Sequence, residues 1–159
     1  MHIAKGFTIV ELIVCIAIMG ILASLAVPNY INQVDKARAS VAKQNLSALN
    51  NAQLIRKQET GSFEPEDLTR LGVLPPKNSY YSYGVDPIPN RDGVFMRATP
   101  RVGWELKSYF AAVVQLRERL ASIICESKST SVGNLQKSDL LVNASDSTLT
   151  CRNNASAIK

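Results

Sequence analysis

The sequence predicts an α+β chain in which one long N-terminal helix precedes a globular head that contains strands. Three observations lead to this prediction. Phe7–Val27 is an apolar run whose only charged residue is Glu11. Apolar residues then recur every three to four positions as far as Ile55, which is the period of an amphipathic helix. From Gly61 onward the chain carries turn signals and short runs rich in Tyr, Val and Phe, which indicate strands.

The apolar run Phe7–Val27 has the dimensions of a membrane span. A helix of this length would measure about 32 Å, enough to cross the hydrocarbon core of a bilayer. An ordinary secretory signal is cut after its apolar region. Here Lys5 and Gly6 precede the run, so a cut after Gly6 would leave the apolar segment on the mature chain, beginning at Phe7. Conventional cleavage in the Ala-Ser-Leu-Ala sequence at residues 23–26 stays open.

Glu11 is the informative residue of this run. A carboxylate near the start of a helix inside hydrocarbon costs about 2 to 3 kcal/mol unless it finds a partner. Cleavage after Gly6 would create an α-amino group four residues upstream, and the amine of one subunit could neutralise the carboxylate of another. The alternative is that Glu11 lies near the membrane interface and extends its side chain to water.

The residues around this junction resemble the class III signal of type IV prepilins and type II secretion pseudopilins. The matching sequence is Lys-Gly-Phe-Thr-Ile-Val-Glu-Leu at residues 5–12. The resemblance implies that a prepilin peptidase cuts between Gly6 and Phe7 and methylates the new N-terminus at Phe7. It also implies that Phe7 and Glu11 serve assembly and that Pro28 kinks the helix.

Helical spacing of apolar residues continues beyond Pro28, while charged residues occupy the other faces. Proline removes one backbone hydrogen bond, so we expect one long helix bent at Pro28, although two separate helices broken there stay open. The resemblance is strong over about residues 5–60 and only architectural beyond. It implies that the first half of the helix forms the core of a filament and that the second half packs on a sheet.

The head begins where Glu-Thr-Gly-Ser at residues 59–62 signals the end of the helix. A loop with a short helix at about 65–71 should follow. Residues 79–85 and 94–99 read as strands separated by prolines and an Asn-Arg-Asp-Gly turn signal. Residues 106–125 are ambiguous, since their spacing slightly favours a helix. The resemblance instead implies a type IV pilin-like fold, with an antiparallel sheet of about four strands on the long helix, and we follow it.

Three cysteines fall into two environments. Cys15 lies in the apolar run, whereas Cys125 and Cys151 lie 26 positions apart in the polar C-terminal third. An even pair in an exported part fits an oxidising compartment, so these two look like one disulfide. Such a bond would contribute roughly 3 kcal/mol on the chain-entropy model. Two buried free thiols are the alternative.

The sequence contains no recognisable catalytic or cofactor motif. The single histidine, His2, lies in the segment expected to be removed, and no CxxC pair, phosphate loop or nucleophile motif occurs. We therefore expect no enzyme, no cofactor and no metal. Glu64, Glu66 and Asp67 could bind a cation, but they read better as charge at the start of the short helix. The net charge is +5, but the basic residues are scattered singly along the chain. This argues against a dedicated nucleic-acid site.

Four regions follow from this reading. We expect a leader peptide at residues 1–6, a transmembrane and filament-core half of the helix at 7–31, an amphipathic half at 32–58 and a globular head with a C-terminal disulfide-bounded region at 59–159.

The resemblance implies a structural pilin of a type IV pilus that supports adhesion, twitching motility or DNA uptake. Such a subunit lies in the inner membrane before assembly and in an extracellular filament afterwards. Its partners would be identical or related pilin subunits, the prepilin peptidase and the inner-membrane assembly platform. A type II secretion pseudopilin and a membrane-anchored binding module that never polymerises are the alternatives.

Overall fold

The computed structural model describes residues 6–73, 75–76, 80–117, 119–130, 139–143, 148–152 and 155–158. The chain divides into two compact units, Met1–Ala37 and Arg38–Lys159. The long helix α1 (Ile9–Thr60) contributes to both units. It is one helix through position 28, so the alternative of two helices broken there is wrong. The kink at Pro28 remains a prediction.

α1 ends at a glycine, as the sequence predicts. Gly61 has a φ of 75°, and its N–H donates to the Lys57 carbonyl oxygen at 3.0 Å. Glycine adopts this left-handed conformation without a Cβ clash, which is why it commonly ends helices. The loop that follows contains a short 3-10 helix, η1 (Leu68–Leu71). The short helix predicted at about 65–71 is therefore confirmed as a single turn.

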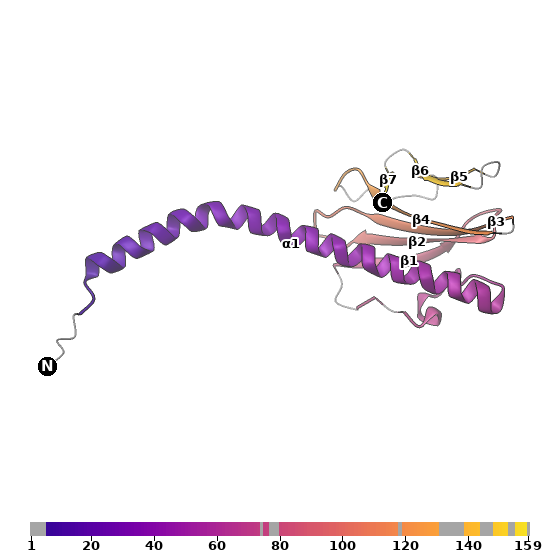
Figure 1. Cartoon of the computed structure of the whole chain (residues 1–159), viewed down its shortest axis with the longest axis horizontal. Coiled ribbons are helices and arrows are strands. Elements are labelled where there is room, and N and C mark those ends of the chain that lie inside the picture. The colour runs from indigo at the N-terminus through magenta and orange to yellow at the C-terminus, as the bar shows by residue number, and fades with distance from the viewer. Residues whose placement is uncertain are drawn as a thin grey trace. The chain divides into compact units, whose positions relative to one another are not determined.

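The second unit is built on an antiparallel sheet of five strands in the order β1-β2-β3-β4-β7 (Figure 1). A separate pair of antiparallel strands, β5 and β6, follows β4 in the chain. The resemblance predicts about four strands; the fifth is the short edge strand β7, contributed by the tail. The strands are β1 (Tyr81–Pro87), β2 (Gly93–Pro100), β3 (Tyr109–Leu116), β4 (Arg119–Ser127), β5 (Leu140–Asn143), β6 (Thr148–Cys151) and β7 (Ala155–Ala157).

One face of the sheet packs on the second part of α1. Ala42, Leu46 and Leu49 are fully buried and lie three or four positions apart, so they share one stripe of the helix. They form one apolar cluster with residues of β1, β2 and β3, among them Met96 and Tyr109. The prediction that the amphipathic half of the helix packs on the sheet is confirmed.

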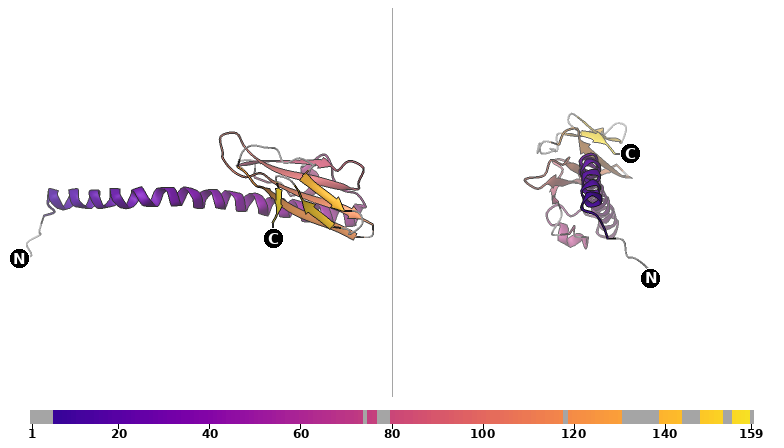
Figure 2. Two further views of the ribbon diagram at one scale, coloured as in Figure 1. Left: turned by 90° about the horizontal axis from the view of Figure 1, so that it is seen from above. Right: turned by 90° about the vertical axis from the view of Figure 1, so that its left-hand side faces the viewer.

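The opposite face of the sheet carries a second apolar cluster. Phe95 of β2 and Phe110 of β3 stack there with ring centroids 4.7 Å apart. Leu140 of β5 and Leu149 of β6 pack against this cluster, and Figure 2 shows the two short strands lying over the sheet. Both faces of the sheet are therefore covered, each by a different part of the chain.

The ambiguous residues 106–125 form strands rather than a helix. β3 is buried at seven of its eight positions because it lies in the middle of a sheet covered on both faces. A strand buried on both faces reads as a continuous apolar run without alternation, and this hides its period from the sequence. The choice implied by the resemblance is confirmed.

Gly93 lies at the start of β2, where the backbone of β3 comes very close. A Cβ at this position would lie 2.7 Å from the carbonyl oxygen of Val113 and 3.1 Å from Cα of Val114. Both are backbone atoms of fully buried residues in β3, so they cannot move aside easily.

Gly93→Ala should therefore lower the free energy of unfolding by about 1 to 3 kcal/mol, the usual cost of overpacking. Gly84→Ala in β1 is the matched control, because its Cβ would meet only the flexible side chain of Arg97, with Nη2 at 3.3 Å. Urea unfolding of the detergent-solubilised chain, followed by circular dichroism, measures both. Equal midpoints for the two variants would contradict this account of Gly93.

Candidate functional site

The first part of α1, together with Phe7 just before it, exposes apolar side chains on every side. The exposed fraction of each large apolar side chain there ranges from 51% to 77%. An amphipathic surface helix would bury one stripe, whereas a helix that is apolar all round needs an apolar environment all round. The exposed side chains are Phe7, Ile9, Val10, Leu12, Ile13, Val14, Ile16, Ile18, Met19, Ile21, Leu22, Leu25, Val27, Tyr30 and Ile31.

The apolar segment at residues 7–31, named the assembly segment after the role that the resemblance implies, is long and apolar enough to cross a membrane. Its most apolar window has a mean hydropathy of 2.6 and is not buried by any other part of the described chain. Cys15, the remaining free cysteine, lies exposed within the segment in the single chain. Length, composition and exposure together make the assembly segment the candidate functional site.

The start of the assembly segment is organised by Thr8 and Glu11. The backbone N–H and the hydroxyl of Thr8 both donate to Oε2 of Glu11, at 2.8 and 2.9 Å. In return, the N–H of Glu11 donates to the Thr8 hydroxyl at 3.2 Å. This reciprocal pattern is a capping box, which satisfies N–H groups that a helix start otherwise leaves unpaired.

Thr8 is the functional residue that our sequence reasoning missed. The signal was present, because Thr-x-x-Glu before an apolar run is the sequence pattern of a capping box. The capping box accounts for Glu11 more directly than snorkelling does, since the carboxylate has a local role at the helix start. Within the described residues, no hydrogen bond reaches its other oxygen, Oε1.

The predicted cleavage junction lies outside the helix. Gly6 and Phe7 precede Ile9, the first residue of α1, and both are exposed. Nothing lies within 4 Å of the position that a Cβ on Gly6 would occupy. Residues 1–5 of the predicted leader lie outside the described residues. An exposed, non-helical junction is accessible to a peptidase, and cleavage there would leave both residues of the capping box on the mature chain.

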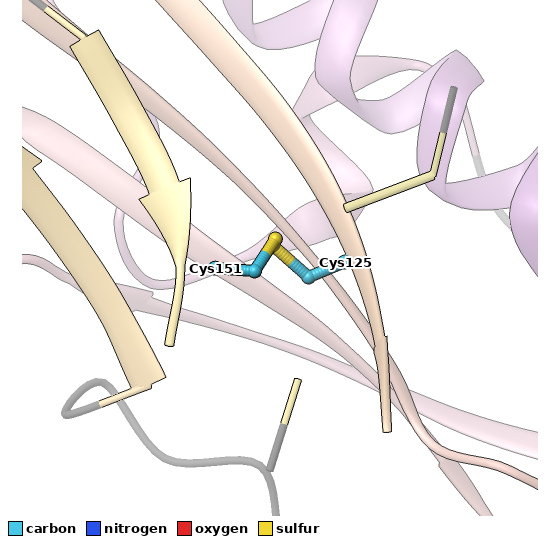
Figure 3. The surroundings of a disulfide bond; sticks show 2 residues. All are labelled: Cys125 and Cys151. Carbon is cyan, nitrogen blue, oxygen red and sulfur yellow. A yellow bond between two sulfur atoms is a disulfide. The ribbon is translucent and has the colours of Figure 1, made fainter. Parts of the chain in front are cut away.

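The predicted pair Cys125 and Cys151 is bonded in the structure (Figure 3). Cys125 is fully buried on β4, and Cys151 is the last residue of β6. The bond therefore ties the separate pair β5–β6 to the main sheet across 26 residues of chain. The alternative of two free thiols is wrong.

The acidic residues 64–67 do not come together as a cation site. Glu64 is buried and pairs with Arg56 at 3.0 Å and with Arg70 at 3.9 Å. Asp67 caps η1, and the hydroxyl and backbone N–H of Thr69 hold the pKa of its carboxyl below the usual value. The reading as helix N-terminal charge thus fits Asp67 but is wrong for Glu64, whose charge is balanced by arginines. Across the described residues, no group of three or more potential metal ligands occurs.

Two family models match the chain. The model described as type IV pilin-like G and H matches residues 39–152, and the model of the prokaryotic N-terminal methylation motif matches residues 1–27. The first covers most of the head, and the second covers the predicted leader and most of the assembly segment. No solved structure gives a significant match.

Similar proteins include both pilins and secretion proteins. The chain is 37% identical over 81 residues to the type IV major pilin protein PilA of Myxococcus xanthus, covering 51% of this chain and 36% of that protein. It is 34% identical over 100 residues to the type II secretion system core protein G of Aeromonas hydrophila, covering 63% and 67%. The same core protein of Pseudomonas aeruginosa is 43% identical over 88 residues, covering 44% and 62%.

Thr8→Val should destabilise the first turn of α1 by about 1 kcal/mol, because valine has the same shape as threonine but no hydroxyl to accept the N–H of Glu11. Thr8→Ser keeps the hydroxyl and is the matched control. Hydrogen exchange of the amides of residues 9–11 in detergent micelles measures the effect. Exchange rates that are the same in the two variants would show that the capping box contributes nothing to the helix start.

Proposed function

Because this chain belongs to the type IV pilin-like family of structural subunits, we propose that it is the pilin of a type IV pilus, polymerised through its assembly segment. The observation that carries this proposal is the apolar segment 7–31, exposed on every side and interrupted by one carboxylate at its start. A helix of this kind suits a bilayer before assembly and a bundle of identical helices after it.

Maturation is the first step of the proposed function. A prepilin peptidase cuts after Gly6 and methylates Phe7, which becomes the first residue of the subunit. The exposed, non-helical position of the junction supports this step, as does the match to the N-terminal methylation motif. The subunit then waits in the inner membrane as a single-pass protein until the assembly platform adds it to an extracellular filament.

Glu11 directs assembly. The new α-amino group at Phe7 and the carboxylate of Glu11 are each costly when left alone in an apolar filament core, and they become tolerable when paired. Thr8 holds Oε2 of Glu11 at the helix start, while Oε1 accepts no hydrogen bond within the described part of the chain. The amine of a neighbouring subunit can therefore bind this oxygen without breaking the capping box, and the pair fixes the axial register of the filament.

A type II secretion pseudopilin is the second candidate. The relatives named type II secretion system core protein G favour it, because the chain covers about two thirds of the length of that protein in Aeromonas. The disulfide-bounded C-terminal region favours the pilus. The two candidates share maturation and polymerisation but differ in what is built, since a pseudopilin forms a short periplasmic filament.

Surface filaments sheared from the cells that produce this chain should contain it as a subunit that begins at Phe7 and carries one added methyl group. Intact-mass spectrometry of the filaments, together with electron microscopy, checks both points. A chain found only in the periplasm and required for protein secretion would instead support the pseudopilin. A mature chain that begins after Ala26 would refute the maturation step.

Glu11→Ala and Glu11→Gln should both leave cleaved subunits in the inner membrane without filaments, because each removes the negative charge that pairs with the Phe7 amine. Insertion and cleavage should continue, since the apolar run and the junction are intact. Glu59→Gln removes a carboxylate from the exposed end of α1 and is the matched control. Filament counts beside an immunoblot of cleaved subunit give the answer, and normal piliation of Glu11→Gln would refute charge pairing.

A further inference from the structure

A tight turn between β2 and β3 presents an apolar side chain to solvent. Within Arg101–Trp104, the N–H of Trp104 donates to the carbonyl oxygen of Arg101 at 3.3 Å. Gly103 occupies the third position with a φ of 95°, a conformation that favours glycine. Val102 stands at the tip of this turn and is 98% exposed. The hydrogen-bonded turn holds an apolar residue where the fold gives it no cover.

Two aromatic rings and an arginine support the turn. The rings of Tyr80 and Trp104 meet edge to face with centroids 5.1 Å apart. The guanidinium carbon of Arg38 lies 4.4 Å from the Tyr80 centroid and 4.2 Å from the Trp104 centroid. These contacts join α1, the residue before β1 and the β2–β3 connection, which are far apart in the sequence. The rings are therefore held in place even though they remain 42% and 37% exposed.

We call Arg38, Tyr80, Val102 and Trp104 the aromatic cluster. It contains the exposed large apolar side chains that the described head carries beyond α1. Among the described residues that follow the helix, the large apolar side chains classed as exposed are Tyr80, Val102 and Trp104. Isolated exposed apolar residues are ordinary on a protein surface. Here the three come together from two segments, and such gathering marks a contact surface.

We propose that the aromatic cluster binds the surface of a phospholipid membrane while the subunit is unassembled. Tryptophan and tyrosine suit the boundary between hydrocarbon and water, because each has an apolar ring and a polar end. Arg38 and Arg101 bring positive charge that suits anionic headgroups, while Asp35, one turn before Arg38 on α1, and Glu105, next to Trp104, are the acidic residues close to them in sequence.

The chain itself provides the reason to choose a membrane as the occupant. Arg38 follows Val27 by eleven residues on the same helix, so the cluster includes a residue close in sequence to the segment that can cross a bilayer. The inference rests on the membrane-anchored state of the proposed function, which a pilin and a pseudopilin share. It does not depend on which filament is built.

Trp104 is the single tryptophan of the chain and reports directly on this contact. The full-length chain is placed, one copy per disc, in nanodiscs of phosphatidylethanolamine and phosphatidylglycerol with acyl chains brominated near the headgroup. Trp104 fluorescence should be quenched relative to discs of unbrominated lipid. Val102→Asp should abolish the quenching, because it places a charge at the tip of the turn.

Ile55→Asp is the matched control, since Ile55 is also exposed but lies in α1 outside the aromatic cluster, and it should leave the quenching unchanged. Circular dichroism and the intact Cys125–Cys151 bond verify that each variant is folded. Quenching that is absent in the parent chain, equal in Val102→Asp, or found only with two or more copies per disc would overturn the proposal. The last result would assign the cluster to a contact between subunits. Filament counts are scored separately, so a failure here is distinct from a failure of the proposed function.

Discussion

The structure depends on one constraint, namely that the assembly segment has no apolar partner within the described part of its own chain. Fifteen large apolar side chains are exposed there, and burying each would contribute about 1.5 to 3 kcal/mol. The sum far exceeds the cost of about 2 to 3 kcal/mol for placing the Glu11 carboxylate in hydrocarbon. The segment must therefore leave water, and the cost of the Glu11 carboxylate is too small to prevent this.

The head solves the opposite problem by completing its own core. The buried stripe of α1 covers one face of the five-stranded sheet, and the pair β5–β6, tied down by Cys125–Cys151, packs on the other. Gln53 closes the end of α1 onto the following loop, because its amide exchanges two hydrogen bonds with the backbone of Glu64, at 2.7 and 2.9 Å. Among the described residues of the head, the exposed large apolar side chains are Val41 and Ile55 on α1 and Tyr80, Val102 and Trp104, which lie together.

Local signals in the sequence were enough to predict helical structure as far as Ile55, although they left a break at Pro28 open, and to identify the apolar residues of the assembly segment. The apolar run, its one carboxylate and the helical period to Ile55 act between residues three or four positions apart, so they can be read without the fold. The same holds for the helix end at Gly61 and for the capping box, whose Thr8 we overlooked although its pattern is local. The pairing of Cys125 with Cys151 was predicted because both lie in the polar C-terminal third, whereas the third cysteine lies in the apolar run, but two free thiols stayed open until the structure was known.

The sequence alone therefore determined that an apolar helix begins near the N-terminus and continues as an amphipathic helix into a β-rich head. Only the tertiary structure decided that residues 106–125 are strands; in β3, burial on both faces removes the alternation that would identify a strand. It also decided that Glu64 forms ion pairs with Arg56 and Arg70 rather than interacting with the N-terminus of a helix. The contacts among Arg38, Tyr80 and Trp104 likewise became visible only in the structure. Each of these depends on contacts between segments far apart in the chain, and such contacts arise only when the sheet closes against α1.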